Sequence, residues 1–256
     1  MRSRFLLPIL LMSLAGAVPV SASPVDITDI IGQWQNAVGG PLTLSDNQAG
    51  QGVDRIRWGA HTGWSLEGSG YDFTPGANIL GVTVGTPFVL GTFTHHNQTI
   101  PLGTEITAVQ YAFQFQTNGL PGVLGTTLNF FHNETPNTPP PNCPPGTIGM
   151  LCADVVTMSA AFVGGPVTVG NEIYTFTLLG FSPDGLNFNS SYLSQELASN
   201  TTKLYALVSS KLVATPEPAA LLLLGSGLAA AAAAARRMRT RRAARSATPI
   251  AAPTQD

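Results

Sequence analysis

The chain has 256 residues and a formal net charge of −2, which hides an uneven distribution of charge. Residues 23–213 carry four basic and twelve acidic side chains, a net charge of −8, while arginines gather near both ends. An acidic central section does not attract nucleic acid through phosphate contacts, so we expect no nucleic-acid partner. Gly, Pro, Thr, Ser and Asn are abundant, which favours extended segments and tight turns over helices.

The N-terminal segment, residues 1–22, has the pattern of a secretory signal peptide. Arg2 and Arg4 precede an apolar run, and Val20-Ser21-Ala22 supplies the small residues that favour cleavage after Ala22. An amphipathic helix that stays on the protein is the alternative, but the run shows no polar face. We therefore predict a signal helix and an exported protein.

Residues 23–213 are predicted to form one antiparallel β-sandwich or jelly-roll-like domain, so the fold class is mainly β. Several segments alternate apolar and polar residues with a period of two, and turn signals such as "TNGLPG" and "SPDG" separate them. Many short strands without a long helical period are typical of this architecture. The inward faces are predicted to hold Val109, Tyr111, Phe113 and Phe115; Tyr174, Phe176 and Leu178; and Leu204, Ala206, Val208 and Leu212.

The segment "LGTFTHHNQTIP", residues 90–101, is the most distinctive part of this domain. On a strand His95 and His96 point to opposite faces, so they cannot both bind one metal ion. Side chains such as Thr94 and Asn97 commonly bond the local backbone where a strand ends. We therefore favour a structural role, in which His95 or Asn97 holds the strand exit, over a ligand site.

Residues 134–153 interrupt the strand pattern with a proline-rich loop, whose tip is bracketed by Cys143 and Cys152. An exported protein meets oxidising conditions, so we predict a disulfide that closes this loop. A cysteine-based metal site is disfavoured because the chain has neither CxxC spacing nor a nearby pair of histidines.

The C-terminal part contains a short apolar run, residues 219–235, which we predict to be a transmembrane helix of minimal length. A basic cluster follows it, and excess positive charge stays on the cytoplasmic side, so the domain should lie outside the cytoplasm. Pro216-Glu217-Pro218 precedes the run and fixes an extended backbone. Residues 246–256 are expected to be disordered. The basic cluster consists of Arg236, Arg237, Arg239, Arg241 and Arg242.

The order of Pro-Glu-Pro, apolar run and arginines over residues 214–245 resembles the PEP-CTERM sorting signal. The resemblance implies a Gram-negative bacterium and an exosortase that recognises the signal. It also implies a precursor tethered to the inner membrane, and then release to the cell envelope or extracellular matrix. A single-span protein that is never processed is the alternative.

A second resemblance concerns Thr94-His95-His96-Asn97, which matches the T-H-x-N motif of the THxN group of PEP-CTERM proteins. The flanking residues 90–93 and 100–101 fit the same pattern, as do Arg57-Trp58-Gly59 and Gly70-Tyr71-Asp72-Phe73. The domain is also similar to the related choice-of-anchor extracellular domains. The group implies no established activity for these residues.

No GxSxG, HExxH or P-loop pattern is present, and no DxDxDG-type loop supplies calcium ligands, so we assign no catalytic residue, metal or cofactor. The favoured function is a non-enzymatic envelope or matrix protein, with exopolysaccharide contact as a further hypothesis. The alternative is a secreted carbohydrate-active hydrolase, which a cleft with two facing carboxylates would favour.

Overall fold

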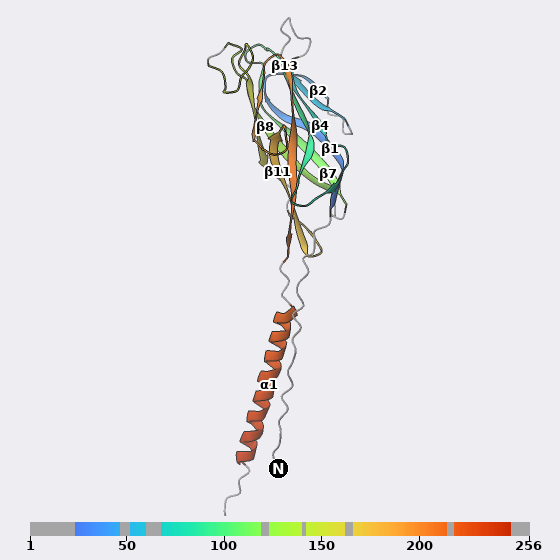
Figure 1. Ribbon diagram of the computed structural model, residues 1–256, viewed down its shortest axis with the longest axis vertical. Coiled ribbons are helices and arrows are strands. Elements are labelled where there is room, and N and C mark those ends of the chain that lie inside the picture. Colours follow the sequence, from blue (N-terminus) through green and yellow to red (C-terminus); the bar gives the residue numbers. More distant parts are fainter. Residues whose placement is uncertain are drawn as a thin grey trace, which may run out of the picture. The chain divides into compact units, whose positions relative to one another are not determined.

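The computed structural model describes residues 24–46, 52–59, 68–118, 123–139, 142–161, 166–213 and 218–246. The chain divides into two compact units at Lys211 and Leu212. The first unit, called the body below, holds the strands, and the second holds one helix (Figure 1). The predicted signal peptide, Pro216, Glu217 and nearly all of the predicted disordered tail lie outside the described residues.

Two sheets form the body, and the strand pairs within them are antiparallel, which confirms the predicted mainly-β class. The first sheet has the order β12-β9-β8-β7-β1-β5, and the second has the order β10-β11-β13-β6-β4-β3-β2. The strands of the first sheet are β12 (Ser191–Ser194), β9 (Asp154–Ala161), β8 (Val123–Asn133), β7 (Ile106–Thr117), β1 (Val25–Gly39) and β5 (Ile79–Val82). Those of the second are β10 (Val167–Val169), β11 (Glu172–Ser182), β13 (Ala198–Leu212), β6 (Pro87–Asn97), β4 (Ser69–Pro75), β3 (Asp54–Trp58) and β2 (Leu42–Asp46).

Aromatic side chains from both sheets meet in one core, as in a β-sandwich. Trp34 of the first sheet lies 5.6 Å from Tyr71 of the second, measured between ring centroids. Phe93 and Phe130 stack across the same space at 5.3 Å. Burying each such side chain contributes about 1.5–3 kcal/mol, so the facing sheets are held mainly by these contacts.

The predicted inward positions are largely confirmed. All four of those assigned in β7 are buried, as are Tyr174 and Phe176 in β11, while Leu178 is half-buried against the core. In β13 the prediction is wrong for Leu212, which is 57% exposed. The register of β13 against β6 shifts between Leu204 and Tyr205, and the strand runs past its partner before it ends.

Strand β1 was not predicted, although it lies in the interior of its sheet between β7 and β5. Its alternation is broken: Val25 and Ile27 are buried, but the next inward residue is Ile30. Asp29 between them has a positive φ of 52°, and the register against β7 shifts there. Such a bulge moves the inward set by one residue and hides the strand from a period-two search.

The second unit contains helix α1 (Pro218–Ser246), which includes the whole basic cluster and ends well beyond the predicted residue 235. No helix among the described residues is long and apolar enough to cross a membrane. The transmembrane helix predicted over residues 219–235 is therefore not supported. The predicted run over residues 219–235 is interrupted by the small or polar Gly225, Ser226 and Gly227.

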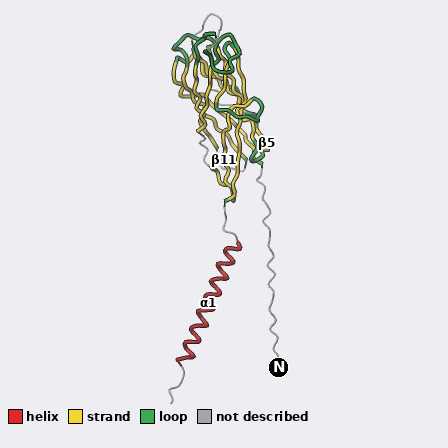
Figure 2. Tube along the Cα trace, turned by 60° about the vertical axis from the view of Figure 1, so that its left-hand side comes forward, coloured by secondary structure: helices red, strands yellow, loops and turns green. Residues whose placement is uncertain are grey.

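One end of the body carries most of the loops (Figure 2). The strand registers bring four chain segments together there: the ends of β6, β8 and β12 and the start of β9. Asn97 at the end of β6 pairs with Ala198, Asn133 at the end of β8 pairs with Val155, and Ser194 pairs with Asp154. The polar cluster described next lies at this end.

Candidate functional site

His95 is the first member of a buried polar cluster between the two sheets. His95 and His96 lie on opposite faces of β6, as predicted. The structure shows that His95 and Asn97 point inward, while Thr94 and His96 face outward. The His95 ring is fully buried and lies between aromatic rings, 5.9 Å from Trp58 and 5.0 Å from Tyr71. Neither of its ring nitrogens has a hydrogen-bond partner among the described residues. The expected hydrogen bond from His95 to the neighbouring backbone is therefore absent there.

Asn97 does bond the backbone, but not locally. Its Nδ2 donates to the carbonyl of Ser194 at 3.0 Å, and both residues are fully buried. This bond joins the end of β6 to the end of β12 in the other sheet. Asn97 thus bonds backbone at the strand exit, but its partner lies in the other sheet and not in the neighbouring backbone that was predicted.

His132, on β8 of the first sheet, faces His95 across the core. The ring centroids are 5.1 Å apart and the planes almost perpendicular, at 86°. Its Nδ1 bonds the hydroxyl of Tyr71 at 2.7 Å, and its Nε2 lies 3.1 Å from Glu134 Oε2 and 3.7 Å from Asp154 Oδ2. The two imidazoles therefore come from opposite sheets and meet at one end of the core.

Three carboxylates complete the cluster. Glu134 follows β8, Asp154 begins β9, and Glu196 lies in the turn between β12 and β13. The backbone N–H of Thr135 donates to Asp154 Oδ1 at 2.8 Å. Asp154 Oδ2, Glu134 Oε1 and both oxygens of Glu196 have no hydrogen-bond partner in the described part of the chain. One oxygen from each carboxylate lies within 4.8 Å of the others.

The buried environment shifts the pKa values of the ionisable side chains in this cluster. Burial, followed by the neighbouring carboxylates, raises the pKa of Asp154 to about 7 and that of Glu196 to about 8. Burial is also the main cause that raises the pKa of Glu134 to about 7. The His95 pKa is lowered well below its ordinary value, first by burial and then by His132. His95 is therefore a neutral imidazole near pH 7.

Two overlapping sets of side chains could hold a metal ion. The first is His95, His132 and Asp154, and the second is Glu134, Asp154 and Glu196; the ligand atoms of each set lie within 4.8 Å of one another. Glu134 also lines an open hollow of about 340 Å³ together with Glu105, Ile100 and Leu102. Among the described residues of the cluster, Glu134 is the one that lines this hollow.

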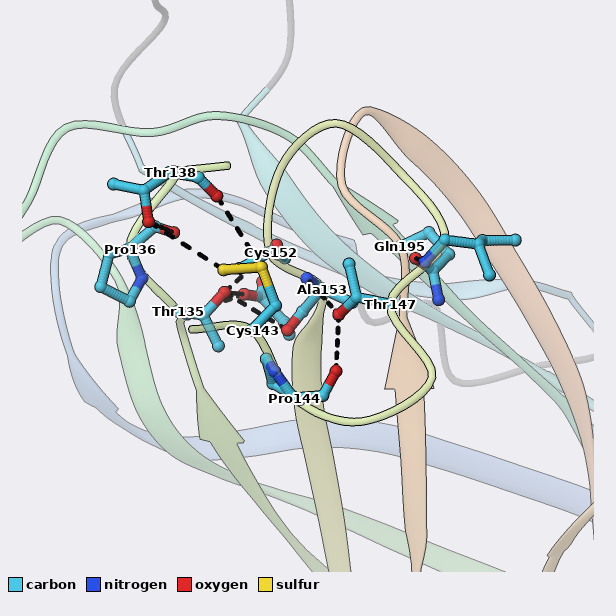
Figure 3. The surroundings of a disulfide bond; sticks show 11 residues. Thr135, Pro136, Thr138, Cys143, Pro144, Thr147, Cys152, Ala153 and Gln195 are labelled. Carbon is cyan, nitrogen blue, oxygen red and sulfur yellow. Dashed lines mark hydrogen bonds between the residues drawn. A yellow bond between two sulfur atoms is a disulfide. The ribbon is translucent and has the colours of Figure 1, made fainter. Parts of the chain in front are cut away.

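The predicted disulfide between Cys143 and Cys152 is present, with a Cα–Cα distance of 4.7 Å (Figure 3). The loop that it closes lies beside the carboxylates. The Thr135 hydroxyl donates to the carbonyl of Cys152 at 3.2 Å, two residues before Asp154. Gln195, next to Glu196, accepts a hydrogen bond from the Ile148 backbone at 3.0 Å. The disulfide loop thus fixes the chain on both sides of the cluster.

The outward face of the same strands holds a separate ionic group. His96 Nε2 lies 3.0 Å from Asp72 Oδ2, and Arg57 Nη1 lies 2.6 Å from Asp72 Oδ1. In each of the pairs Arg57-Trp58 and Tyr71-Asp72, one side chain therefore points into the core and the other lies on the outward face of the sheet. Trp58 and Tyr71 line the core cluster, while Asp72 and Arg57 join His96.

Sequence reasoning missed His132, Glu134, Asp154 and Glu196 as site residues. A signal existed for two of them. In β8, His132 lies an even number of residues from the buried Leu128 and Phe130, and is therefore on the same face of the strand. In β9, Asp154 is on the same face as Val156 and Met158 for the same reason. A titratable residue at an inward strand position is unusual and marks a candidate site. Glu196 lies in a turn and has no such periodic signal.

The comparison with known protein families concerns the second unit. Residues 214–239 match the PEP-CTERM protein-sorting motif. The chain carries a PEP-CTERM sorting signal. This signal implies an exported protein that an exosortase processes. It includes Pro216-Glu217-Pro218, whose last residue begins α1, and the arginines up to Arg239, which lie within α1. A search of curated proteins finds no match to the chain.

Proposed function

We propose that this chain is a non-enzymatic protein of the cell envelope or extracellular matrix of a Gram-negative bacterium, delivered there through its PEP-CTERM signal. The match over residues 214–239 carries the proposal. A β-rich body with a disulfide precedes the signal, and disulfides persist in exported proteins. We further assign residues 94–97 and their surroundings to the T-H-x-N motif, whose His and Asn are the inward members.

A hydrolase fits the carboxylates less well. A glycosidase needs two carboxyl groups about 5–5.5 Å apart when it retains configuration, and about 6.5–9.5 Å apart when it inverts. The oxygens of Glu134, Asp154 and Glu196 converge within 4.8 Å, and Asp154 is fully buried. This spacing is close to that of a retaining enzyme, but a fully buried Asp154 is out of reach of a sugar ring, so we assign the carboxylates to binding or structure.

The exopolysaccharide contact is proposed for the outer face of the first sheet. This face carries a row of linked amides: Asn36 Nδ2 donates to Gln110 Oε1 at 2.6 Å, and Gln110 Nε2 donates to Asn129 Oδ1 at 2.9 Å. The ring of Phe131, 48% exposed, belongs to the same face. Amides and an exposed ring suit sugar hydroxyls and their apolar faces.

Two measurements test the proposal. C-terminal peptides of the protein should be absent from surface material of the native host and present in a host that lacks its exosortase. Intact peptides from residues 245–256 on surface-localised protein in both hosts would make the segment a plain anchor. A glycan array and a turnover assay on the same exopolysaccharide should show binding without cleavage; products of cleavage would favour the hydrolase instead.

A further inference from the structure

We propose that His95, His132 and Asp154 bind one divalent transition-metal ion of the Zn²⁺ class inside the body. The three side chains come from β6, β8 and β9, so the ion would join the two sheets at the end of the core. All three residues are buried, and their ligand atoms lie within 4.8 Å of one another. This site is independent of the sorting signal.

The unpartnered atoms point to a ligand. Both nitrogens of His95 and Oδ2 of Asp154 lack a hydrogen-bond partner among the residues that the structure describes. A buried polar atom without a partner costs about 1–3 kcal/mol, so a fold that keeps three of them together needs compensation. A metal ion provides it at one His95 nitrogen and at Asp154 Oδ2, because it takes up the lone pairs of these two atoms, while the other His95 nitrogen carries the N–H of the neutral ring.

The surroundings of His132 are those of a positioned metal ligand. Its Nδ1 bonds the Tyr71 hydroxyl at 2.7 Å, which leaves Nε2 facing Asp154 and Glu134. A hydrogen bond on the second nitrogen is the usual device that fixes the tautomer and orientation of a metal-binding histidine. His95 is oriented instead by its ring contacts with Trp58 and Tyr71.

The donor set decides the class of metal. Two imidazoles and a carboxylate suit Zn²⁺ and related transition metals, whereas Ca²⁺ requires six to eight oxygens. In a tetrahedral zinc site neighbouring ligand atoms are about 3.3 Å apart, so atoms within 4.8 Å need only small side-chain movements. Glu134 lines the hollow and contacts His132, so it lies between the hollow and the proposed ligands.

The test uses the full chain in detergent, with any affinity tag removed and metals stripped by a chelator. Added Zn²⁺ should bind with one ion per chain by elemental analysis and raise the melting temperature. Co²⁺ should give the visible absorption of a tetrahedral nitrogen and oxygen site. Ca²⁺ at the same concentration should do neither.

The adjacent histidines offer a matched pair of variants. His95→Phe and Asp154→Asn should each weaken Zn²⁺ binding by more than about 100-fold, because even residues that only orient ligands account for 10–100-fold. His96→Gln removes the outward neighbour and should bind Zn²⁺ like the wild type. Circular dichroism and an intact disulfide by mass will show that each variant is folded.

Three results would overturn the proposal. Wild-type protein with less than one Zn²⁺ per chain and no Co²⁺ spectrum would exclude the site. Equal Zn²⁺ affinity in His95→Phe and wild type would exclude these ligands. Preferential binding of Ca²⁺ that His95→Phe leaves unchanged would assign the cluster to Glu134, Asp154 and Glu196 instead. If His95→Phe does not fold, Asp154→Asn and the wild-type Co²⁺ spectrum decide.

Discussion

Trp58 lies almost parallel to His95, with an angle of 22° between the ring planes and 5.9 Å between the centroids. The two residues belong to β3 and β6, which are separated by β4 in the same sheet. His132 from the facing sheet meets both rings nearly edge-on, at 69° and 86°. The imidazole of His95 is thus held by aromatic packing, while that of His132 is held by hydrogen bonds.

This contrast predicts that the same His→Phe change has different effects on the free energy of unfolding at the two positions. In metal-free protein His95→Phe should keep the free energy of unfolding within about 1 kcal/mol of the wild type or raise it, because it removes two unpartnered nitrogens and keeps a ring. His132→Phe should lower it by about 1–3 kcal/mol, since Tyr71 and Glu134 lose their partner. Urea unfolding followed by tryptophan fluorescence measures both. A loss above about 2 kcal/mol for His95→Phe would show that its nitrogens have partners after all.

Asn97→Ala should destabilise the body by about 1–2 kcal/mol. The substitution removes the hydrogen bond from the side chain to the Ser194 carbonyl, a fully buried bond of 3.0 Å between the two sheets. Thr94→Ala on the outward face of the same strand is the matched control. Its hydroxyl bonds Thr201 in an exposed contact, so the change in unfolding free energy should stay below about 0.5 kcal/mol. Equal effects of the two substitutions would contradict the assignment of Asn97 as the inter-sheet link.

How far the sequence predicts this fold is clear from two neighbouring strands. In β7 four apolar residues alternate without interruption, and the prediction of its inward face is confirmed. In the adjacent β1, the bulge at Asp29 shifts the inward set, and Asn36 adds a second residue with positive φ. Alternation identifies a strand only while the backbone stays regular.

The sequence indicates only the half of the candidate site that lies on the second sheet. The T-H-x-N residues and the segments around Trp58 and Tyr71 indicate its part on the second sheet. His132 and Asp154 belong to the facing sheet, and their approach to His95 depends on how the two sheets pack. Parity along β8 and β9 could mark them as inward, but no local pattern pairs them with His95. Glu196 is placed by a turn, which alternation does not describe.

The disulfide should contribute measurably to the stability of the body. Cys143 and Cys152 are nine residues apart, and closing a loop of this size stabilises by roughly 2–3 kcal/mol in the chain-entropy account. The double substitution Cys143→Ser, Cys152→Ser should therefore lower the free energy of unfolding by about this amount. Reductant should have a similar effect on the wild type and none on the variant. Intact mass that shows two free thiols in exported wild-type protein would refute the bond.

The ionic group on the outward face predicts a specific sensitivity to acid. Burial alone would raise the pKa of Asp72, but hydrogen bonds from His96 and Arg57 and their charges lower it below the usual value. A carboxylate with a lowered pKa stabilises the folded state above its unfolded pKa of about 3.9, and this contribution is lost as the pH falls through the folded-state value. Asp72→Asn should therefore flatten the fall in stability below about pH 4.

The measurement is urea unfolding of wild type and Asp72→Asn between neutral pH and pH 3, in chelator. The raised pKa values of Glu134, Asp154 and Glu196 change the free energy of unfolding in the opposite direction. The folded state binds protons at these groups more readily than the unfolded state, so they favour folding as the pH falls. Both proteins contain these groups, so their difference isolates Asp72. The control is Asp29→Asn, which removes an exposed carboxylate and keeps a residue type that tolerates positive φ. It should keep the wild-type acid dependence; if Asp72→Asn does so too, Asp72 does not stabilise the fold through its charge.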